Sequence, residues 1–395
     1  MTRRVFFYVQ HLLGIGHMRR AAAIARALVQ AGAEVVFASG GEAVPGLDLG
    51  GATLIQLPPA SAADANFSKI VDGDGRPIDE AWQKERRRQL LEHFAASRAD
   101  ILLTEMYPFG RRQFRFELLP LLEAAAARAD LPTGKPLIAC SVRDILVDKG
   151  RADRRAETVA LVERYFDLVL VHGDPRLVTL DRTFPDAPRF ADKLRYTGYV
   201  VEPSVRQGRG SRDPLDRQQG EILVSAGGGA VGAPLFTAAI AAKALSRYRA
   251  RPWRLITGRN LPGAAAEEIA HRAAIAGIAV ETFRPDFPAL LQSCLVSVSQ
   301  GGYNTVMELL AAQCPAVIVP FADGSESEQT LRSRLLEERG LLQLVDPAQL
   351  QPAGLAAAID QAAGRADEIA GAMAAFALDL DGAAGTAKLL LQASR

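Results

Sequence analysis

The chain has 395 residues, of which 49% are hydrophobic, and its 46 Lys and Arg nearly balance its 45 Asp and Glu. This length is enough to bury two ordinary hydrophobic cores, so we expect two domains. The balanced charge argues against a dedicated nucleic-acid-binding protein, which would carry a basic excess.

The cysteines and the first residues bear on the compartment. Cys140, Cys294 and Cys314 are far apart in apolar sequence, which favours small core residues in a reducing compartment over a disulfide framework or a zinc site. The chain goes straight from MTRR into the run VFFYVQ, without the longer apolar region and cleavage site of a secretory signal. No run approaches the roughly 18 apolar residues that a membrane span requires. We therefore expect a cytoplasmic protein.

Apolar runs alternate with helical patterns along almost the whole chain, which predicts βα units and parallel sheets. In the first half, the predicted strands are Val5–Gln10, Glu34–Ser39, Thr53–Gln56, Ile101–Thr104, Leu137–Ser141, Leu168–His172 and Leu194–Thr197. The clearest helices between them are Met18–Ala31, Asp79–Arg98, Phe116–Ala129 and Arg154–Tyr165. In the second half, the predicted strands are Ile222–Ser225, Arg254–Thr257, Ala279–Thr282, Leu295–Ser299, Ala316–Pro320 and Leu342–Val345.

These elements fall into two series separated by one polar segment. Residues 201–219 lack an apolar period and are dense in Arg, Gly, Pro and Ser, so we predict a linker there. We predict an N-terminal domain over residues 1–200 and a C-terminal domain over residues 220–395, which ends in helices. The expected fold class is α/β, with two doubly wound, Rossmann-like domains facing a cleft.

The first candidate site is the turn HLLGIGHMRR, which follows the first strand. Gly14 and Gly16 let this turn pass close to a bound group, and His17 lies near the N-terminus of the next helix. The helix dipole there lowers the pKa of the imidazole and favours its proton-accepting form. His17 is therefore a candidate base. A histidine that only caps or packs in the turn is the alternative.

Polar residues also follow later strands of the first half. Glu105 comes just after a buried strand and is a candidate general base. The segment CSVRDIL sets Ser141, Arg143 and Asp144 at the end of the next strand. The segment HGDP, which starts at His172, likewise places polar residues at the end of the strand after that.

Residues 107–122 interleave aromatic side chains with Arg111, Arg112 and Arg115. Such a pattern suits nucleic acid, a membrane surface or a phosphorylated acceptor. A partly packed helix with a solvated basic face is the favoured interpretation. The same pattern also predicts peripheral contact with the inner face of a membrane through residues 107–122.

The second half opens with the glycine-rich segment ILVSAGGGAVG. Gly227, Gly228 and Gly229 lie between a strand and a helix, where backbone N–H groups can cradle a diphosphate. The segment also satisfies G-x-G-x-x-G, the pattern of a dinucleotide-dependent dehydrogenase. That class needs an acidic residue after the next strand, where this chain has Arg259 instead. Because an arginine suits a phosphorylated ribose, the dehydrogenase stays open as an alternative.

Leu295–Leu336 is the most informative stretch. It has the pattern of a strand, glycine turn, helix, strand, polar loop and helix. Gly301 and Gly302 form the turn, and Asn304 or Thr305 can cap the following helix.

Glu308 lies one turn into the same helix, where its carboxylate can accept hydrogen bonds from a pair of hydroxyls. The free N–H groups at the helix N-terminus can bind an anion. These groups lie at the carboxyl ends of strands, where open α/β sheets bind ligands. The stretch therefore predicts a site for a phosphorylated, hydroxyl-bearing ligand.

Two acidic motifs, DGDG from Asp72 and DLD from Asp379, resemble metal-binding pairs. Neither follows a strong strand, and DGDG lacks the Glu that a calcium loop needs at its twelfth position, where Gln83 stands. No cluster of His, Cys and carboxylates has metal-ligand spacing. We expect no metal site and no bound cofactor.

The stretch SQGGYNTVMELLAAQCPAVIVPFADGSESEQ, together with the glycine turns, resembles the GT-B glycosyltransferases, and most closely their MurG-like branch with its family 28 C-terminal domain. The shared pattern is a glycine turn, T-x-x-E, small-x-P-x-I-x-x-P and a closing Gln. Within that branch, the chain from Val5 to Leu350 looks like a group of bacterial predicted glycosyltransferases.

The resemblance implies a nucleotide-sugar co-substrate, UDP-linked, bound without a required metal. It implies that Glu308 holds the ribose hydroxyls. Gly301, Gly302 and Thr305 would face the diphosphate, with the glycines at 227–229 on its other side.

The remaining roles also follow from the resemblance. Gln329 and Glu328 would contact the hydroxyls of the donor sugar. Phe283 and Arg284, in the loop after the third strand of the second half, would contact the base. His17 would act on the acceptor side. The donor-side candidates are Gly227, Gly228, Gly229, Arg259, Phe283, Arg284, Gly301, Gly302, Asn304, Thr305, Glu308, Glu328 and Gln329. The acceptor-side candidates are Gly14, Gly16 and Arg143.

The chain departs from the MurG pattern on the acceptor side. Its first glycine turn has fewer glycines, CSVRDIL stands where MurG has a polar HEQN-like stretch, and residues 107–122 have no counterpart. These departures imply an acceptor other than lipid-linked muramyl peptide.

Our main hypothesis is an inverting, metal-independent hexosyltransferase that uses a UDP-sugar and an unidentified hydroxyl acceptor. His17 is the first candidate base, followed by Glu105 and Asp144. The alternatives are a non-hydrolysing UDP-sugar 2-epimerase, an NAD(P)-dependent dehydrogenase and a catalytically silent sugar-nucleotide-binding regulator.

Overall fold

The computed structural model describes residues 2–12, 16–63, 69–129, 134–147, 151–202, 219–228, 231–321 and 328–394. The predicted Gly14, Gly229 and most of the linker, residues 203–218, lie outside the described residues. Each predicted strand corresponds to a strand in one of two parallel sheets.

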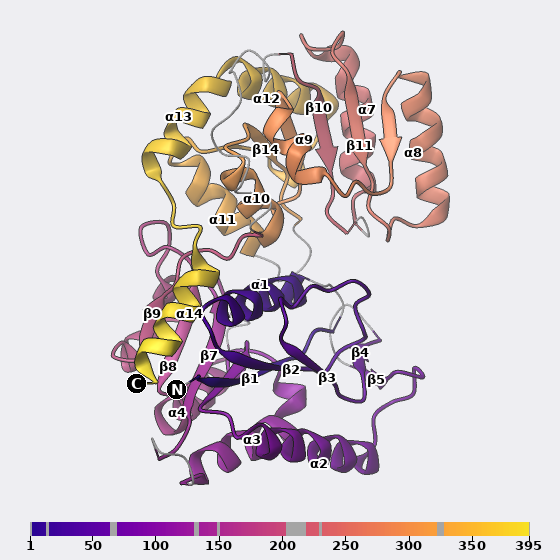
Figure 1. Ribbon diagram of the computed structural model, residues 1–395. Helices are drawn as coiled ribbons and strands as arrows, with labels where there is room; N and C mark the ends of the chain where they lie inside the picture. Colours follow the sequence, from indigo (N-terminus) through magenta and orange to yellow (C-terminus); the bar gives the residue numbers. More distant parts are fainter. Residues whose placement is uncertain are drawn as a thin grey trace. The chain divides into compact units, whose positions relative to one another are not determined.

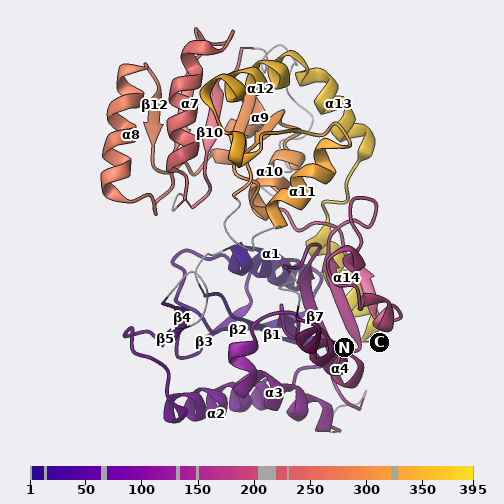
Figure 2. The same cartoon turned by 180° about the vertical axis from the view of Figure 1, so that it is seen from behind.

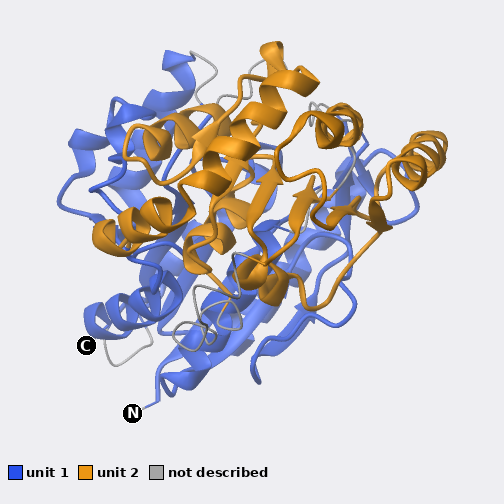
Figure 3. Ribbon diagram, turned by 90° about the horizontal axis from the view of Figure 1, so that it is seen from above, with its two compact units in different colours: residues 1–200, 379–395 blue, residues 201–378 orange. Residues whose placement is uncertain are grey.

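The chain folds into two compact units (Figure 3). Unit 1 comprises Met1–Val200 and Asp379–Arg395, and unit 2 comprises Val201–Leu378. The sequence predicts a C-terminal domain over all residues from 220 to 395. That assignment is wrong for Asp379–Arg395, because this segment returns to unit 1.

Unit 1 is built on a seven-stranded parallel sheet with the order β3-β2-β1-β6-β7-β8-β9. Counted along the sheet-forming strands, this is the 3-2-1-4-5-6 order of a Rossmann fold with one added strand. A small antiparallel pair, β4-β5, accompanies it. The strands are β1 Arg4–Val9, β2 Glu34–Ser39, β3 Thr53–Gln56, β4 Ala60–Ala62, β5 Ile70–Asp72, β6 Ile101–Glu105, β7 Leu137–Arg143, β8 Leu168–His172 and β9 Leu194–Tyr196.

Helices cover both faces of this sheet (Figures 1 and 2). The apolar residues of α1 and α14 form one core with the sheet, and those of α2, α3 and α4 form the other. Near-continuous apolar strands such as β1 and β8 suit this arrangement, because both of their faces are buried. The helices are α1 Gly16–Gln30, α2 Glu80–Ser97, α3 Arg115–Ala127, α4 Ala152–Tyr165 and α14 Gly382–Ala393, with short 3-10 turns at η1 Arg112–Phe114, η2 Leu180–Arg182 and η3 Ala187–Phe190.

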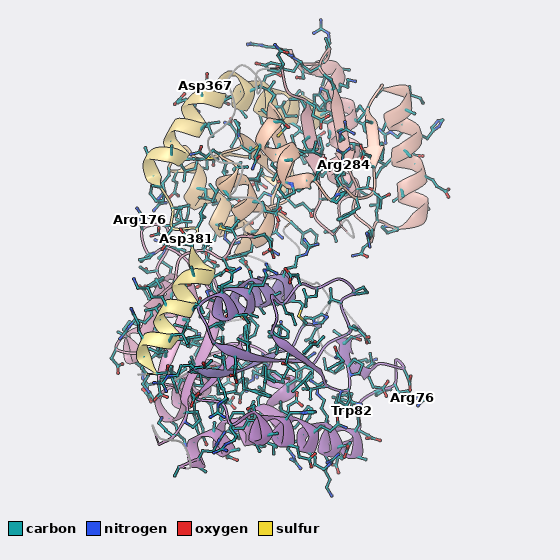
Figure 4. The ribbon with its side chains drawn as sticks, viewed as in Figure 1. Arg76, Trp82, Arg176, Arg284, Asp367 and Asp381 are labelled. Atoms are coloured by element: carbon teal, nitrogen blue, oxygen red, sulfur yellow. The ribbon has the colours of Figure 1, made fainter. Side chains whose placement is uncertain are left out.

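The C-terminal segment is anchored before α14 begins. The N–H of Tyr199 donates to the carbonyl of Asp379 at 2.7 Å, and the N–H of Gly382 donates to the carbonyl of Tyr199 at 3.0 Å. Asp174 accepts from the N–H of Asp379 at 3.1 Å and pairs with Arg176, which is labelled in Figure 4. These bonds fix the start of α14, which packs against α1.

Unit 2 is built on a six-stranded parallel sheet with the order β12-β11-β10-β13-β14-β15, again the Rossmann order. The order reverses between β10 and β13. This switch point is where such sheets bind ligands. The strands are β10 Ile222–Ser225, β11 Trp253–Ile256, β12 Ala279–Glu281, β13 Val296–Ser299, β14 Ala316–Ile318 and β15 Gln343–Leu344.

The helices of unit 2 connect these strands (Figure 1). Helix α7 packs against α8 and α12, and α9 packs against α10. The helices are α7 Ala233–Leu245, α8 Gly263–Ile275, α9 Phe287–Ser293, α10 Tyr303–Ala311, α11 Glu328–Glu337, α12 Pro352–Gly364 and α13 Ala366–Phe376, with a 3-10 turn at η4 Pro347–Gln349. Within the described parts of the chain, no helix has the length and apolar character needed to cross a bilayer.

A buried ion pair ties α2 and α3 to the sheet of unit 1. Arg86 and Glu117 are both fully buried, with Nε of Arg86 2.9 Å from Oε2 of Glu117. Arg86 also donates to Oε1 of Gln10 at 2.5 Å and to the carbonyl of Gly40 at 2.9 Å. The pair therefore positions the residues that follow β1 and β2, next to the first candidate site.

Candidate active site

His17 is the second residue of α1, and its side chain is 16% exposed. Nδ1 lies 3.0 Å from Oε1 of Glu105, and Nε2 lies 2.5 Å from Nη2 of Arg143. A guanidinium can only donate, and Arg143 is closer to Nε2 than Nη2 of Arg20 is to Nδ1, at 3.2 Å. Nδ1 also faces the carboxylate of Glu105, so we assign the proton to Nδ1 and the lone pair to Nε2. The imidazole is therefore held as a neutral base with its lone pair on Nε2.

The surroundings of His17 keep it neutral. Burial lowers the pKa of His17 well below its usual value, and the positive charges of Arg143, Arg111 and Arg20 lower it further. We had expected a lowered pKa from the helix dipole alone. The sequence did not show that three arginines surround the ring.

Glu105 is the last residue of β6, and its carboxylate is fully buried. The sequence predicts it just after the strand, as a candidate general base. Instead, Oε1 is paired with Arg20 and His17, and Oε2 accepts from the hydroxyl of Ser141 at 2.6 Å. In this arrangement Glu105 orients His17 and does not itself present a free oxygen.

Three further side chains, those of Ser141, His172 and Thr197, extend the hydrogen bonding from Glu105 across the sheet. The hydroxyl of Ser141, on β7, lies 2.6 Å from Nε2 of His172, on β8. Nδ1 of His172 lies 2.8 Å from the hydroxyl of Thr197. All three side chains are buried. A continuous row of polar groups therefore runs from His17 to Thr197.

Asp144 is placed differently from the prediction. Its carboxylate is fully buried and accepts from the hydroxyl of Tyr199 at 2.8 Å. It also packs against Gly173, where a Cβ would come within 2.6 Å of the Cβ of Asp144. These contacts fit a residue that fixes the 197–200 segment better than a base that is open to an acceptor.

The aromatic and basic segment at 107–122 is mostly packed. Tyr107 and Phe114 are buried, and Phe109 and Phe116 are partly buried against the core of unit 1.

The arginines of the segment have partners. Arg112 and Arg115 form ion pairs with Glu157 of α4, and Nε of Arg111 donates to the carbonyl of Gln10 at 2.6 Å. These contacts favour the packing interpretation over exposed membrane contact.

In unit 2, α10 begins at the switch point directly after β13. Gly302 is its N-cap and has no side chain to occupy the first N–H groups. Asn304 and Thr305 were predicted to cap the helix, but they lie inside its first turn and are half-buried. Glu308 is one turn further and is also half-buried. The helix therefore offers N–H donors and a carboxylate within its first two turns.

The two glycines of this turn differ. A Cβ at Gly301 would come within 2.9 Å of Oγ of Ser333, and within 3.3 Å of the Cβ of Gln329. At Gly302, no described atom lies within 4 Å of such a Cβ, and the backbone φ of −59° suits any residue. Gly301 is required by packing, whereas the space beside Gly302 is available to a ligand.

Glu328 and Gln329 open α11, which follows the loop after β14. Glu328 is buried and pairs with Arg332 at 2.9 Å, so its carboxylate is engaged inside the unit. Oε1 of Gln329 accepts from the N–H of Phe321 at 3.0 Å, which leaves the amide N–H₂ directed away from that bond. Of the two, Gln329 fits a contact with a sugar hydroxyl better.

The glycine-rich turn after β10 is held in close contact with the next strand end. Gly227 has a positive φ of 55°. A Cβ at Gly258, after β11, would lie 2.7 Å from the carbonyl oxygens of Gly227 and Gly228. Gln300, which we did not predict, links this region to β13 by donating to the carbonyl of Val231 at 3.2 Å. Its signal was its place directly after a strand.

An exposed aromatic side chain lies beyond β12. Phe283 is 50% exposed, and the guanidinium of Arg259 stacks on its ring at 4.8 Å. Arg284 instead pairs with Asp286 and Glu281. Phe283 and Arg259 therefore form a flat surface suited to a base, while Arg284 supports the loop.

No group of three or more His, Cys, Asp or Glu residues among those that the structure describes is arranged to hold a metal ion. Arg20 is the main residue of this site that the sequence pattern did not indicate. It lies three positions after His17, which is the spacing of neighbours on one helix face.

The chain is similar in sequence to known glycosyltransferases. Residues 224–385 match the model of the glycosyltransferase family 28 C-terminal domain. A UDP-N-acetylglucosamine--N-acetylmuramyl-(pentapeptide) pyrophosphoryl-undecaprenol N-acetylglucosamine transferase of Nitrosococcus oceani is 32% identical over 182 residues, which is 45% of this chain and 49% of that protein. An enzyme of the same name from a Methylobacterium species is 28% identical over 183 residues, 46% of this chain and 49% of that protein. The chain thus spans about half the length of the curated relatives it matches.

Solved structures match over nearly the whole chain. The MurG of Acinetobacter baumannii has a TM-score of 0.62 at 16% identity and covers 99% of both chains. The calicheamicin glycosyltransferase CalG4 has a TM-score of 0.63 at 16% identity, and the match covers 100% of this chain and 98% of that one. These matches show the fold, which is that of the GT-B glycosyltransferases. The expected resemblance to the MurG-like branch is confirmed.

Proposed function

We propose that this chain, which has the GT-B fold and carries a family 28 C-terminal domain over residues 224–385, transfers a sugar from a nucleotide sugar to an acceptor hydroxyl. The observation that carries the proposal is the start of α10 at the switch point of unit 2. There, uncapped N–H groups, open space at Gly302 and the carboxylate of Glu308 lie together.

This site suits a UDP-linked hexose. The N–H groups at the start of α10 bind the diphosphate, with the turn at Gly227 and Gly228 on its other side. Glu308 accepts hydrogen bonds from the ribose hydroxyls. The base stacks on Phe283 and Arg259. The two relatives described above are transferases named for UDP-N-acetylglucosamine, which supports uridine as the base.

The acceptor side is assigned to His17. Nε2 takes the proton of the acceptor hydroxyl while the oxygen forms a bond to the anomeric carbon. The bond from that carbon to the diphosphate breaks on the opposite side, so the configuration inverts. Glu105 stabilises the imidazolium that forms, much as a buried carboxylate orients a catalytic histidine elsewhere. Arg143 must leave Nε2 for the acceptor to reach it.

The leaving diphosphate is stabilised by backbone N–H groups, which are fixed before the reaction and need no metal. The proposed transfer is therefore metal-independent. The acceptor carries a hydroxyl and differs from the lipid-linked muramyl peptide, because the acceptor side of this chain departs from the MurG pattern. We place the reaction in the cytoplasm.

Calorimetry tests the donor assignment. We expect UDP to bind the wild type and the Glu308→Ala variant to bind it roughly tenfold to a hundredfold more weakly, as expected for the loss of hydrogen bonds to a charged group. ADP is the control for the base. Equal affinity of both proteins for UDP, or no binding to either, would contradict the proposal.

A screen of nucleotide sugars against acceptor pools, read by mass spectrometry, tests the reaction. We expect a glycosylated product that is formed equally with and without EDTA and is lost in His17→Ala. A donor that is epimerised without any acceptor would show a 2-epimerase instead. Donor binding without turnover in any pool would show a regulator.

A further inference from the structure

We propose that Ser141 and His172 are positioning residues of this site, which hold Glu105 in the orientation that keeps the proton of His17 on Nδ1. Their catalytic meaning rests on the proposed function. The directions of their hydrogen bonds are independent of the proposed function and can be measured on the protein without substrate.

The register of the sheet brings these side chains to one face. Glu105 pairs with Ser141 across β6 and β7, and Arg143 pairs with His172 across β7 and β8. Because Ser141 and Arg143 are two residues apart, all four side chains project to the same side. That side is the one covered by α1 and α14, so His17 on α1 meets the row from above the sheet.

Counting protons fixes the direction of the row. Ser141 has one hydroxyl proton but two neighbours at 2.6 Å, Oε2 of Glu105 and Nε2 of His172. A buried carboxylate oxygen without a donor is costly. The hydroxyl of Ser141 is the donor that the structure places on Oε2, at 2.6 Å. The hydroxyl of Ser141 therefore donates to Glu105.

This choice determines the tautomer of His172. Burial lowers the pKa of His172 well below its usual value, so the ring is neutral and has a single N–H. With the Ser141 proton committed to Glu105, Nε2 of His172 must donate to Ser141. Nδ1 of His172 then accepts from the hydroxyl of Thr197 at 2.8 Å, in place of the other acceptors of that hydroxyl, the carbonyls of Gly198 at 2.9 Å and Val171 at 3.3 Å. The two histidines carry their protons on opposite nitrogens, His17 on Nδ1 and His172 on Nε2.

The consequence for the reaction is geometric. Oε1 of Glu105 can face Nδ1 of His17 only while Oε2 is held elsewhere, and Ser141 holds it. Without that bond the carboxylate can rotate, and the lone pair of His17 is no longer kept on the nitrogen that must take the proton. Partners that orient a catalytic ligand in this way are commonly as sensitive to mutation as the ligand.

Long-range proton–nitrogen spectra of protein with nitrogen-15-labelled histidine test the proton positions. The chain has five histidines, and the signals are assigned with His17→Gln and His172→Gln variants. We expect neutral rings at neutral pH, with His17 protonated at Nδ1 and His172 at Nε2. In Ser141→Ala, the proton of His172 is expected to shift to Nδ1, where Thr197 can accept it. Ser141→Thr keeps the hydroxyl and is expected to keep the wild-type tautomer.

Turnover gives the second readout. Ser141→Ala is expected to lower kcat about tenfold with unchanged UDP affinity, and Ser141→Thr to restore most of it. Ser297→Ala is the matched control, because Ser297 is also a buried strand serine, with no hydrogen-bond partner among the described residues. It is expected to leave both kcat and the histidine spectra unchanged.

The outcomes separate this inference from the proposed function. A wild-type His172 that is protonated on Nδ1 would overturn the inference, because Ser141 would then donate to His172 and not to Glu105. The predicted tautomers in a protein without transferase activity would support the hydrogen-bond row and refute the reaction. Full turnover in Ser141→Ala would refute the positioning role even if the tautomers are as expected.

Discussion

Nη2 of Arg143 lies 2.5 Å from Nε2 of His17. The nitrogen that the proposed reaction needs as a base is therefore already occupied by a cation when no acceptor is present. This contact has two effects. It blocks the lone pair sterically, and its positive charge lowers the proton affinity of the ring.

Removing the charge of Arg143 is expected to raise the pKa of His17. Among the charged neighbours of the ring, Arg143 contributes most to the lowered pKa, after burial itself. In Arg143→Met the imidazolium loses a like-charged neighbour, so the pKa moves back towards its usual value. A histidine NMR titration measures this. Arg112→Met, which removes an arginine that pairs with Glu157 instead, is the control, and equal titration of His17 in both variants would contradict the expectation.

The two glycines before α10 are expected to respond differently to an added methyl group. Gly302→Ala should fold with an unchanged melting temperature, because its φ is ordinary and no described atom is within reach. It should lose UDP affinity, since the methyl group would enter the space assigned to the diphosphate. Gly301→Ala should instead lower stability through its contact with Ser333. Thermal unfolding and calorimetry on both variants check this, and normal UDP binding by Gly302→Ala would argue against the donor site.

Glu328→Ala is expected to act on stability and not on sugar binding. The substitution leaves Arg332 buried without its partner, which commonly costs about 3–5 kcal/mol. Urea unfolding measures the loss. The double variant Glu328→Ala with Arg332→Leu should recover much of the stability. If Glu328→Ala keeps full stability but loses affinity for the nucleotide sugar, the carboxylate has the sugar-binding role that the family resemblance implied.

The stability of unit 1 is expected to fall as the pH drops below about 6.5, the ordinary pKa of histidine. The pKa values of His17 and His172 are lowered in the folded protein, so the unfolded chain takes up protons in this range and the folded one does not. Each of the two histidines then lowers the free energy of unfolding by up to about 1.4 kcal/mol for each pH unit below the pKa of the unfolded chain. Above that pKa both states are neutral at these rings, and this stability is fully present.

Tryptophan fluorescence can follow the unfolding of unit 1 alone. The chain has two tryptophans. Trp82 lies in unit 1 and Trp253 in unit 2, so Trp253→Phe leaves a single reporter. Urea midpoints at pH 7.5 and 5.5 are expected to differ less in a His172→Leu background. An equal drop in both backgrounds would show that other groups cause it.

The sequence predicted both sheets because their apolar runs are short, continuous and separated by helical patterns. It also placed the polar groups at strand ends, which is why His17, Glu105 and Glu308 could be proposed. It could not show which strand-end groups meet. Arg20 meets Glu105 only because α1 packs on the sheet, and His172 is linked to Glu105 through Ser141 only because of the register of β6, β7 and β8. Likewise, local pattern suggested that Asn304 caps α10, but the helix starts at Tyr303.

The return of the last helix to unit 1 has a consequence for recombining this protein with its relatives. Helix α14 contributes Ala387 and Leu390 to the core that α1 forms with the sheet, and α1 carries His17. A chimera with one crossover near residue 200 would replace α14 with the last helix of the relative, so that α1 would pack against a foreign helix. Exchanging the nucleotide-binding half cleanly therefore takes two junctions, one after Val200 and one before Asp379. The natural module for grafting is an insertion within the chain, not its C-terminal half.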